Sequence, residues 1–304
     1  MEKAVLGAYN HAHSWIGSGR VASYIPQLKA ANIHHLGVAI TDMQGNLYSA
    51  GDSRVPFTMQ SISKLIILAA ALQDVGFERV FSCVGMEPTG DAFNSIVRLE
   101  AAMDKPMNPM INAGAISVVT CIEGATAELR FEKILNLARL LLNSPSLTYD
   151  ENVYLSESKT GDKNRALAYM MKSNGVIGGD VGEHLEVYFK ACSLLVTCEE
   201  LSYFAAVLAN NGVAPKTGVQ ILPPFGVKVI RSLMTTCGLY DASGEYALRV
   251  GIPSKSGVGG GIIGAVPNKM GIAVFSPGLD QKGNSFCGIK AMEYLSQVLD
   301  LSIF

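Results

Sequence analysis

The sequence of 304 residues lacks long apolar runs and basic runs and is poor in charge, and each absence excludes a class of protein. No stretch approaches about 18 consecutive apolar residues, so we expect no membrane-spanning helix and no membrane partner. Charged residues make up only 16% of the chain and the net charge is −2, which argues against binding to nucleic acid. Because 49% of the residues are hydrophobic, we expect a large core and apolar subunit interfaces.

Sequence fingerprints for metals and organic cofactors are also missing. The six cysteines include no Cys-x-x-Cys pair, and the five histidines include no His-Glu-x-x-His. The chain has neither a phosphate-binding loop nor the Gly-x-Gly-x-x-Gly spacing of a dinucleotide site. We therefore expect no metal or organic cofactor, and reduced, buried cysteines. Residues 1–4 lack the basic and apolar regions of a signal peptide, so we expect a cytoplasmic protein.

The most informative stretch is residues 57–72, in which only apolar residues follow Lys64. That pattern predicts a buried helix that Ser61 opens. Ser61 and Lys64 are three residues apart, so on a helix their side chains share one face and can touch. A lysine that is desolvated among apolar neighbours has a lowered pKa and can take the proton that makes serine nucleophilic. Ser61 and Lys64 are thus candidates for a nucleophile and its base.

The Ser-x-x-Lys spacing is weak evidence by itself, because a chain of this length contains about one copy by chance. A second copy, Ser156 and Lys159, lies in a polar stretch where nothing desolvates the lysine. A buried helix with a serine N-cap and a lysine that extends to solvent also explains Ser61 and Lys64. The choice between these interpretations depends on what else the chain places near Ser61.

Residues 255–261, Lys-Ser-Gly-Val-Gly-Gly-Gly, can supply what the Ser61 helix lacks. A Lys-Ser/Thr-Gly strand accompanies Ser-x-x-Lys in serine β-lactamases and penicillin-binding proteins. The N–H group of Val258 could pair with that of Ser61 to stabilise an oxyanion. Two further copies, at 159–161 and 216–218, lie in polar, turn-like stretches and are set aside. A flexible glycine-rich strand without a catalytic role is the structural alternative.

Strands are predicted near both ends of the chain. Residues 36–41 and 47–51 flank turn residues and predict a β-hairpin. Residues 255–266 and 270–275 predict two further strands, followed by a final helix over about 284–299. Between them, apolar residues recur at helical spacing in 115–122, 131–142, 165–172, 181–195 and 199–209.

This order of elements predicts a single α/β domain of the α+β type over residues 1–304. Residues of about 1–74 and 241–304 would form an antiparallel sheet subdomain, and about 75–240 would form a helical subdomain beside it. A site would then lie in the cleft between the sheet and the helices.

Eight segments, in this order, resemble the serine-dependent glutaminases of bacteria, which are related to the catalytic domain of the animal enzymes. They are residues 21–26, 60–64, 108–115, 156–157, 164–165, 188–193, 236–240 and 255–261. The resemblance covers essentially the whole chain. It implies a fold like that of serine β-lactamases and penicillin-binding proteins. It also implies hydrolysis of L-glutamine to L-glutamate and ammonia through a glutamyl-Ser61 acyl-enzyme.

The resemblance implies roles for the residues around the reacting amide. Ser61 is the nucleophile, Lys64 is its base, and Ser61 and Val258 contribute the N–H groups of the oxyanion site. Tyr240 lies beside the nucleophile, and Lys255 tunes the hydroxyls and the amine around it.

The resemblance also implies a site for the free amino acid. Asn112, Asn164 and Tyr188 hold the α-carboxylate, Glu157 pairs with the α-ammonium, and Tyr24 lines the pocket, as does Tyr240. Buried donors and a buried acid are what a desolvated zwitterion requires. On the residues alone, the stretch from Glu157 to Asn164 reads as a solvated turn with a helix cap. Asn112 alone reads as a turn residue, and the tyrosines read as core aromatics.

Two other functions stay open on the sequence. A penicillin-recognising hydrolase or esterase would share the serine and lysine motifs, although the missing Ser-Asp-Asn motif and signal peptide argue against it. A non-catalytic glutamine-binding module on the same fold is the alternative from another class, and the intact Ser61, Lys64 and Lys255 argue against it. The family and the apolar composition both suggest a homo-oligomer, with a tetramer favoured.

Overall fold

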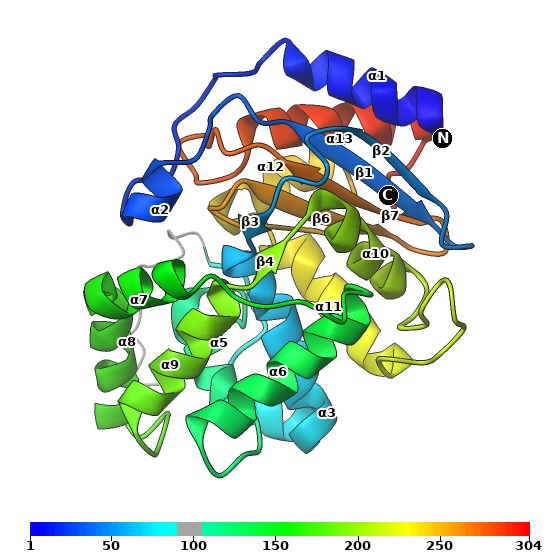
Figure 1. The fold of residues 1–304 in the computed structure, drawn as a ribbon. Coiled ribbons are helices and arrows are strands. Elements are labelled where there is room, and N and C mark those ends of the chain that lie inside the picture. The colour runs from blue at the N-terminus through cyan, green and yellow to red at the C-terminus, as the bar shows by residue number, and fades with distance from the viewer. Residues whose placement is uncertain (90–104) are drawn as a thin grey trace.

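The computed structural model describes residues 1–89 and 105–304 and combines a sheet, covered by helices on both faces, with a second group of helices (Figure 1). The strands are β1 (Gly37–Asp42), β2 (Leu47–Gly51), β3 (Phe57–Thr58), β4 (Leu195–Val196), β5 (Ser254–Ser256), β6 (Gly261–Val266) and β7 (Met270–Phe275). The helices are α1 (Glu2–His13), α2 (Pro26–Lys29), α3 (Ser63–Cys83), α5 (Asn112–Val119), α6 (Ala127–Leu141), α7 (Glu151–Thr160), α8 (Asp162–Ser173), α9 (Val181–Cys192), α10 (Cys198–Ala209), α11 (Pro224–Cys237), α12 (Ser243–Arg249) and α13 (Phe286–Leu299). Two short 3-10 helices are η1 (Gln60–Ile62) and η2 (Tyr240–Ala242).

The five-stranded sheet is built from both ends of the chain, as predicted. Its strand order is β2-β1-β7-β6-β5, and every neighbouring pair is antiparallel. β1 pairs with β7 so that Ala39 lies opposite Ala273. The β1–β2 hairpin turns at Asp42, whose carboxylate accepts hydrogen bonds of 2.9 Å from the N–H groups of Gln44 and Asn46.

Successive side chains of a strand point to opposite sides of the sheet, and in β1, β6 and β7 the residues on both sides are buried, because helices cover both faces. Val38 and Ile40 belong to the core under α1 and α13, whereas Ala39 belongs to the core on the opposite face, which α10 covers. In Figure 1, α1 and α13 lie together above the sheet and α10 lies below it. At Gly271 in β7, a Cβ would come within 2.0 Å of the backbone nitrogen of Ala206, so α10 packs directly on the strand.

The group of helices is centred on α3, which packs against α5, α6 and α11 (Figure 1). The side chains from Leu65 to Leu68 are fully buried on all sides of α3, which explains the continuous apolar run in the sequence. Gly76, with φ of 75°, kinks the helix. Among the residues that the structure describes, no helix is both long and apolar enough to span a bilayer.

The structure corrects several details of the sequence prediction. Residues 255–266 do not form one strand: β5 and β6 are separated by a turn in which Gly260 has φ of 99°, a conformation that favours glycine. Helices α7, α11 and α12 were not among the predicted helical segments. Helix α10 packs on the sheet although it lies within the 75–240 range predicted for the helical subdomain. The division of the chain near 74 and 241 therefore stays a prediction.

Candidate active site

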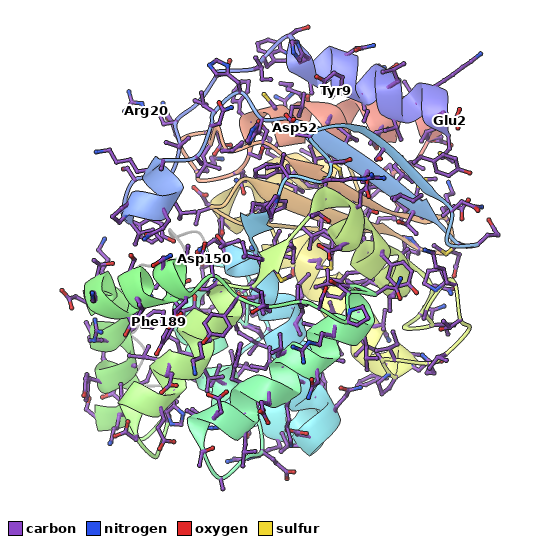
Figure 2. The ribbon with its side chains drawn as sticks, viewed as in Figure 1. Glu2, Tyr9, Arg20, Asp52, Asp150 and Phe189 are labelled. Carbon is purple, nitrogen blue, oxygen red and sulfur yellow. The ribbon has the colours of Figure 1, made fainter. Side chains whose placement is uncertain are left out.

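A cavity of about 320 Å³ lies where the N-terminal end of α3 meets the turn between β5 and β6 and helices α7, α8 and α9. It is lined by Tyr24, Gln60, Ser61, Asn112, Glu157, Thr160, Gly161, Asp162, Lys163, Asn164, Tyr188, Phe189, Cys192 and Val258. Phe189 of α9, which is labelled in Figure 2, is one of these lining residues. A larger depression of about 900 Å³ between α12 and α13 does not include Ser61 among its lining residues, so size alone does not identify the site.

Ser61 and Lys64 are joined at the floor of this cavity. Ser61 lies in η1, just before α3, rather than in the α-helix itself, and Lys64 lies in the first turn of α3. The Lys64 Nζ donates a hydrogen bond of 2.6 Å to the Ser61 Oγ. Burial lowers the pKa of Lys64 to about 8, since desolvation disfavours the ammonium form. A substantial fraction of Lys64 is therefore a neutral amine near neutral pH, and it is already in contact with the hydroxyl it would deprotonate.

Tyr240 and Lys255 do not line the cavity themselves. Tyr240 contacts Ser61, which lines it, and Lys255 packs against Tyr240. The Tyr240 hydroxyl is hydrogen-bonded to the side chain of Ser61, and it donates to the carbonyl oxygen of Ser256 at 3.4 Å. The Lys255 Nζ lies 4.3 Å from the centre of the Tyr240 ring and donates to the carbonyl oxygens of Gly238 and Ser256. These contacts fix the position of the hydroxyl group beside the nucleophile.

Burial also controls the protonation of the Tyr240 hydroxyl and the Lys255 amine. It raises the pKa of Tyr240 to about 12, so the phenol keeps its proton. Burial, followed by the positive charge of Lys64, holds the pKa of Lys255 well below its usual value. Two lysines in one dry cluster titrate as a coupled pair.

The turn between β5 and β6 approaches the nucleophile closely because it consists largely of glycine. A Cβ on Gly257 would come within 2.6 Å of the Met59 carbonyl oxygen, and one on Gly259 within 2.5 Å of the Thr58 carbonyl oxygen. Val258, between them, lines the same cavity as Ser61. The absent side chains thus let the backbone of the turn lie directly against the segment that carries Ser61.

Three of the residues predicted for the carboxylate site form a hydrogen-bonded chain on the helical wall. The Asn112 Nδ2 donates to the Asn164 Oδ1 at 3.0 Å, and the Tyr188 hydroxyl donates to the Asn112 Oδ1 at 3.1 Å. They come from the starts of α5 and α8 and from the middle of α9. Asn112 is the first residue of α5, and this corrects its reading as a turn residue.

Glu157 and Tyr24 form a second hydrogen-bonded group in the lining of the same cavity. The Tyr24 hydroxyl donates to the Glu157 Oε1 at 2.8 Å and lies 3.0 Å from the Gln60 Oε1. Glu157 is only 6% exposed, on the inner face of α7, and burial raises the pKa of its carboxyl. The reading of this stretch as a solvated turn is therefore wrong: the carboxylate is buried in a helix and faces the cavity.

The structure brings together every residue predicted for the site, and it adds two that the sequence analysis did not single out. Gln60, 3% exposed, has φ of 49° and donates through Nε2 to the Thr58 Oγ1 at 3.1 Å. Cys192 is buried and lines the cavity. Both fall inside segments that carry the family resemblance, but a lone amide and a lone thiol give no chemical signal. Over residues 1–89 and 105–304, no group of three or more metal-binding side chains comes together.

Comparisons with known proteins agree with this geometry. A family model described as glutaminase matches residues 19–304. A glutaminase from Alkaliphilus oremlandii (strain OhILAs) is 51% identical over 296 residues, which cover 97% of each chain. A solved structure described as a probable glutaminase ybaS has a TM-score of 0.96 and 41% identity, covering 100% of this chain and 97% of that one. A Bacillus glutaminase structure, in the presence of 4.3 M NaCl, has a TM-score of 0.92 and 37% identity over 99% of both chains.

Proposed function

The chain belongs to the glutaminase family and has its β-lactamase-like fold and amidohydrolase activity, and from this premise we propose that Ser61 hydrolyses L-glutamine through a glutamyl ester. The observation that carries the proposal is the contact of 2.6 Å between the Ser61 Oγ and the Nζ of a fully buried lysine. An activated hydroxyl of this kind is required for acyl transfer without an external base.

In the acylation step, neutral Lys64 accepts the proton of the Ser61 hydroxyl as the Oγ attacks the side-chain amide carbon of glutamine. The N–H groups of Ser61 and Val258 stabilise the negative charge that develops on the amide oxygen. The C–N bond then breaks, and the Lys64 ammonium passes its proton to the leaving nitrogen, directly or through the Tyr240 hydroxyl, so that ammonia departs and Lys64 becomes neutral. The product on the enzyme is an ester between Ser61 and the glutamyl side chain.

In the deacylation step, a water molecule replaces ammonia. Lys64, neutral again, takes a proton from the water as the oxygen attacks the ester carbonyl, and the same two N–H groups hold the oxyanion. The bond to the Ser61 Oγ then breaks, the Oγ regains its proton, and L-glutamate leaves. Lys255 contributes by holding Tyr240 beside Ser61, since its Nζ packs on the Tyr240 ring and shares the Ser256 carbonyl oxygen with the Tyr240 hydroxyl.

Two groups of residues in the lining of the cavity recognise the two charges that the α-carbon of the free amino acid carries. Glu157 pairs with the α-ammonium, and Tyr24 orients its carboxylate through the hydrogen bond of 2.8 Å. Asn112, Asn164 and Tyr188 hold the α-carboxylate: the Asn112 and Asn164 amide nitrogens have hydrogens to donate to it, and Tyr188 fixes the Asn112 amide. A peptide-linked glutamine would lack both charges and would leave these buried groups unpaired, so the site favours the free amino acid.

We also propose a cytoplasmic homo-oligomer, with a tetramer favoured. The reduced state of all six cysteines supports the compartment, and the high apolar content of the sequence supports subunit interfaces. The mass in solution tests the oligomeric state.

Ammonia release from L-glutamine and from L-asparagine, measured for the wild type and for Ser61→Ala, tests the function. Release from glutamine that the substitution abolishes, with the fold intact by circular dichroism, would support the mechanism. Activity that survives in Ser61→Ala would overturn it. Binding of glutamine without ammonia release would favour a non-catalytic module, and hydrolysis of a chromogenic cephalosporin would favour a penicillin-recognising hydrolase.

A further inference from the structure

A buried asparagine lies behind the catalytic cluster, in a part of the chain that the mechanism does not use. Asn284 is fully buried in the turn before α13. Its backbone N–H donates to the Asp280 Oδ1 at 2.9 Å, and its carbonyl oxygen accepts from the Asp280 N–H at 2.8 Å. The turn from 280 to 284 is therefore closed on itself, and it presents the Asn284 side chain to its neighbours as a fixed group.

The Asn284 amide joins two segments that hold Tyr240. Its Oδ1 accepts a hydrogen bond of 2.6 Å from the Ser256 Oγ, and its Nδ2 donates a longer one of 3.5 Å to the Leu239 carbonyl oxygen. A carbonyl oxygen can only accept, so the amide nitrogen must face Leu239 and the amide oxygen must face Ser256. The orientation of the amide is thus determined by its partners.

Both partners of Asn284 belong to residues whose backbone lies next to the reacting centre. The Leu239 carbonyl is part of the peptide bond that enters Tyr240, whose φ of 57° is strained for a bulky side chain. Such a conformation persists only where the surrounding structure holds it. The carbonyl oxygen of Ser256 accepts from the Lys255 Nζ at 2.7 Å and from the Tyr240 hydroxyl at 3.4 Å.

We propose that Asn284 is a positioning residue, which acts through Ser256 and Leu239 to hold the Tyr240 hydroxyl and the Lys255 amine in place beneath Ser61. The proposal rests on the proposed roles of Ser61 and Tyr240. It predicts an effect on the chemical step rather than on binding, because the groups that recognise the substrate come from α5, α7, α8 and α9, on the other wall of the cavity.

The test compares two buried hydrogen-bonded pairs. Asn284→Ala removes the contact with Ser256, and the control Thr41→Val removes a buried contact of 2.7 Å between Thr41 and Ser202, which joins β1 to α10 away from the cavity. We expect Asn284→Ala to lower kcat for glutamine by on the order of 10- to 100-fold with KM within about twofold of the wild type. Thr41→Val should lower the melting temperature and leave kcat within about twofold.

A double-mutant cycle then identifies the route of the effect. If Asn284 acts through Ser256, Ser256→Ala should lower kcat by a similar factor, and the double variant should lose no more than either single variant. If Asn284→Ala does not fold, Asn284→Ser is measured by the same criteria. If the Asn284 variant keeps a kcat within about twofold of the wild type, or loses no more kcat than Thr41→Val, the proposal is overturned. An active Ser61→Ala enzyme would instead overturn the mechanism on which the proposal rests.

Discussion

The chain contains two Ser-x-x-Lys sequences on helical turns, and their surroundings differ completely. Ser61 lies in η1 and Lys64 in the first turn of α3, where Lys64 is 1% exposed and in contact with the serine. Ser156 and Lys159 lie on α7, where the lysine is exposed, and within the described residues no hydrogen bond joins the two side chains. The environment of Lys159 therefore lacks the desolvation that burial imposes on Lys64. The comparison teaches that burial, and not spacing, makes the motif reactive.

The largest expected difference between the two motifs is in catalysis by the serines. Ser61→Ala should lower kcat/KM for glutamine by on the order of 10⁴-fold or more, because the covalent step loses its nucleophile. Ser156→Ala should leave kcat/KM within about twofold. Ammonia release by the purified variants measures both. Comparable losses in the two variants would show that the comparison between the motifs is mistaken.

The second-largest expected difference is between the effects on kcat of substituting Lys64 and Lys159. The activity that depends on Lys64 should also vary with pH. Lys64→Met should lower kcat by on the order of 10²- to 10⁴-fold, the range of a general base, whereas Lys159→Met should have no effect on kcat. Only the neutral amine of Lys64 is active. The kcat/KM of the wild type should therefore rise about tenfold per pH unit below pH 8 and level off above it, since the pKa of Lys64 is about 8. A profile that is flat from pH 6 to 9 would contradict this assignment.

Helix α7 itself offers a second contrast, between its buried and its exposed carboxylates. Glu157→Gln should raise KM for glutamine by about 10- to 100-fold, because the α-ammonium loses its charged partner. Glu151→Gln, on the exposed side of the same helix, serves as the matched control and should leave KM unchanged. Initial rates over a range of glutamine concentrations separate KM from kcat. A fall in kcat alone would show that Glu157 does not bind the ammonium.

The smallest expected effect concerns the N-terminal caps of α7 and α3. The Asp150 Oδ1 caps α7 by accepting a hydrogen bond of 3.0 Å from the Val153 N–H, whereas α3 begins without a side-chain cap (Figure 2). Asp150→Ala should cost about 1 kcal/mol of folding free energy and lower the melting temperature by about 2 °C. Calorimetry measures the shift, and kcat should stay the same. A large loss of activity would mean that the position of Glu157 depends on this cap.

Much of the fold follows from local patterns in the sequence. Strands β1 and β7 and helices α3 and α10 are each visible as nearly continuous apolar residues, because they are buried on both sides, whereas β2 is visible through the turn residues before it. Helix α11 is not visible, because Pro223, Pro224 and Gly226 suggest a loop although a proline suits the first turn of a helix. The turn between β5 and β6 cannot be recognised from the sequence either. Glycine also occurs within strands, so the glycines of 257–261 do not distinguish a turn from a continuous strand.

The residues of the site also divide into those that the sequence reveals by itself and those that it does not. Ser61, Lys64 and Lys255 can be proposed from their own motifs, because an apolar run predicts the desolvation that makes a lysine basic. Glu157 and Asn112 cannot, since the groups that bury them come from distant parts of the chain, such as Tyr24 against Glu157. Only the resemblance to a family identifies these residues. Gln60, next to the nucleophile, shows its importance only through its strained backbone and its contact with Tyr24.

The pairing of β1 with β7 has a consequence for the synthesis of the protein. Ser61 leaves the ribosome long before Lys255, Val258 and β7, which follow roughly 200 residues later, about 10 to 40 s at ordinary rates of translation. Until then the nascent chain carries its nucleophile without an oxyanion site, and the edge of β1 that later pairs with β7 has no partner. The chain therefore becomes an enzyme only after its last strand is made, and its β1–β2 hairpin presents an open strand edge during that interval.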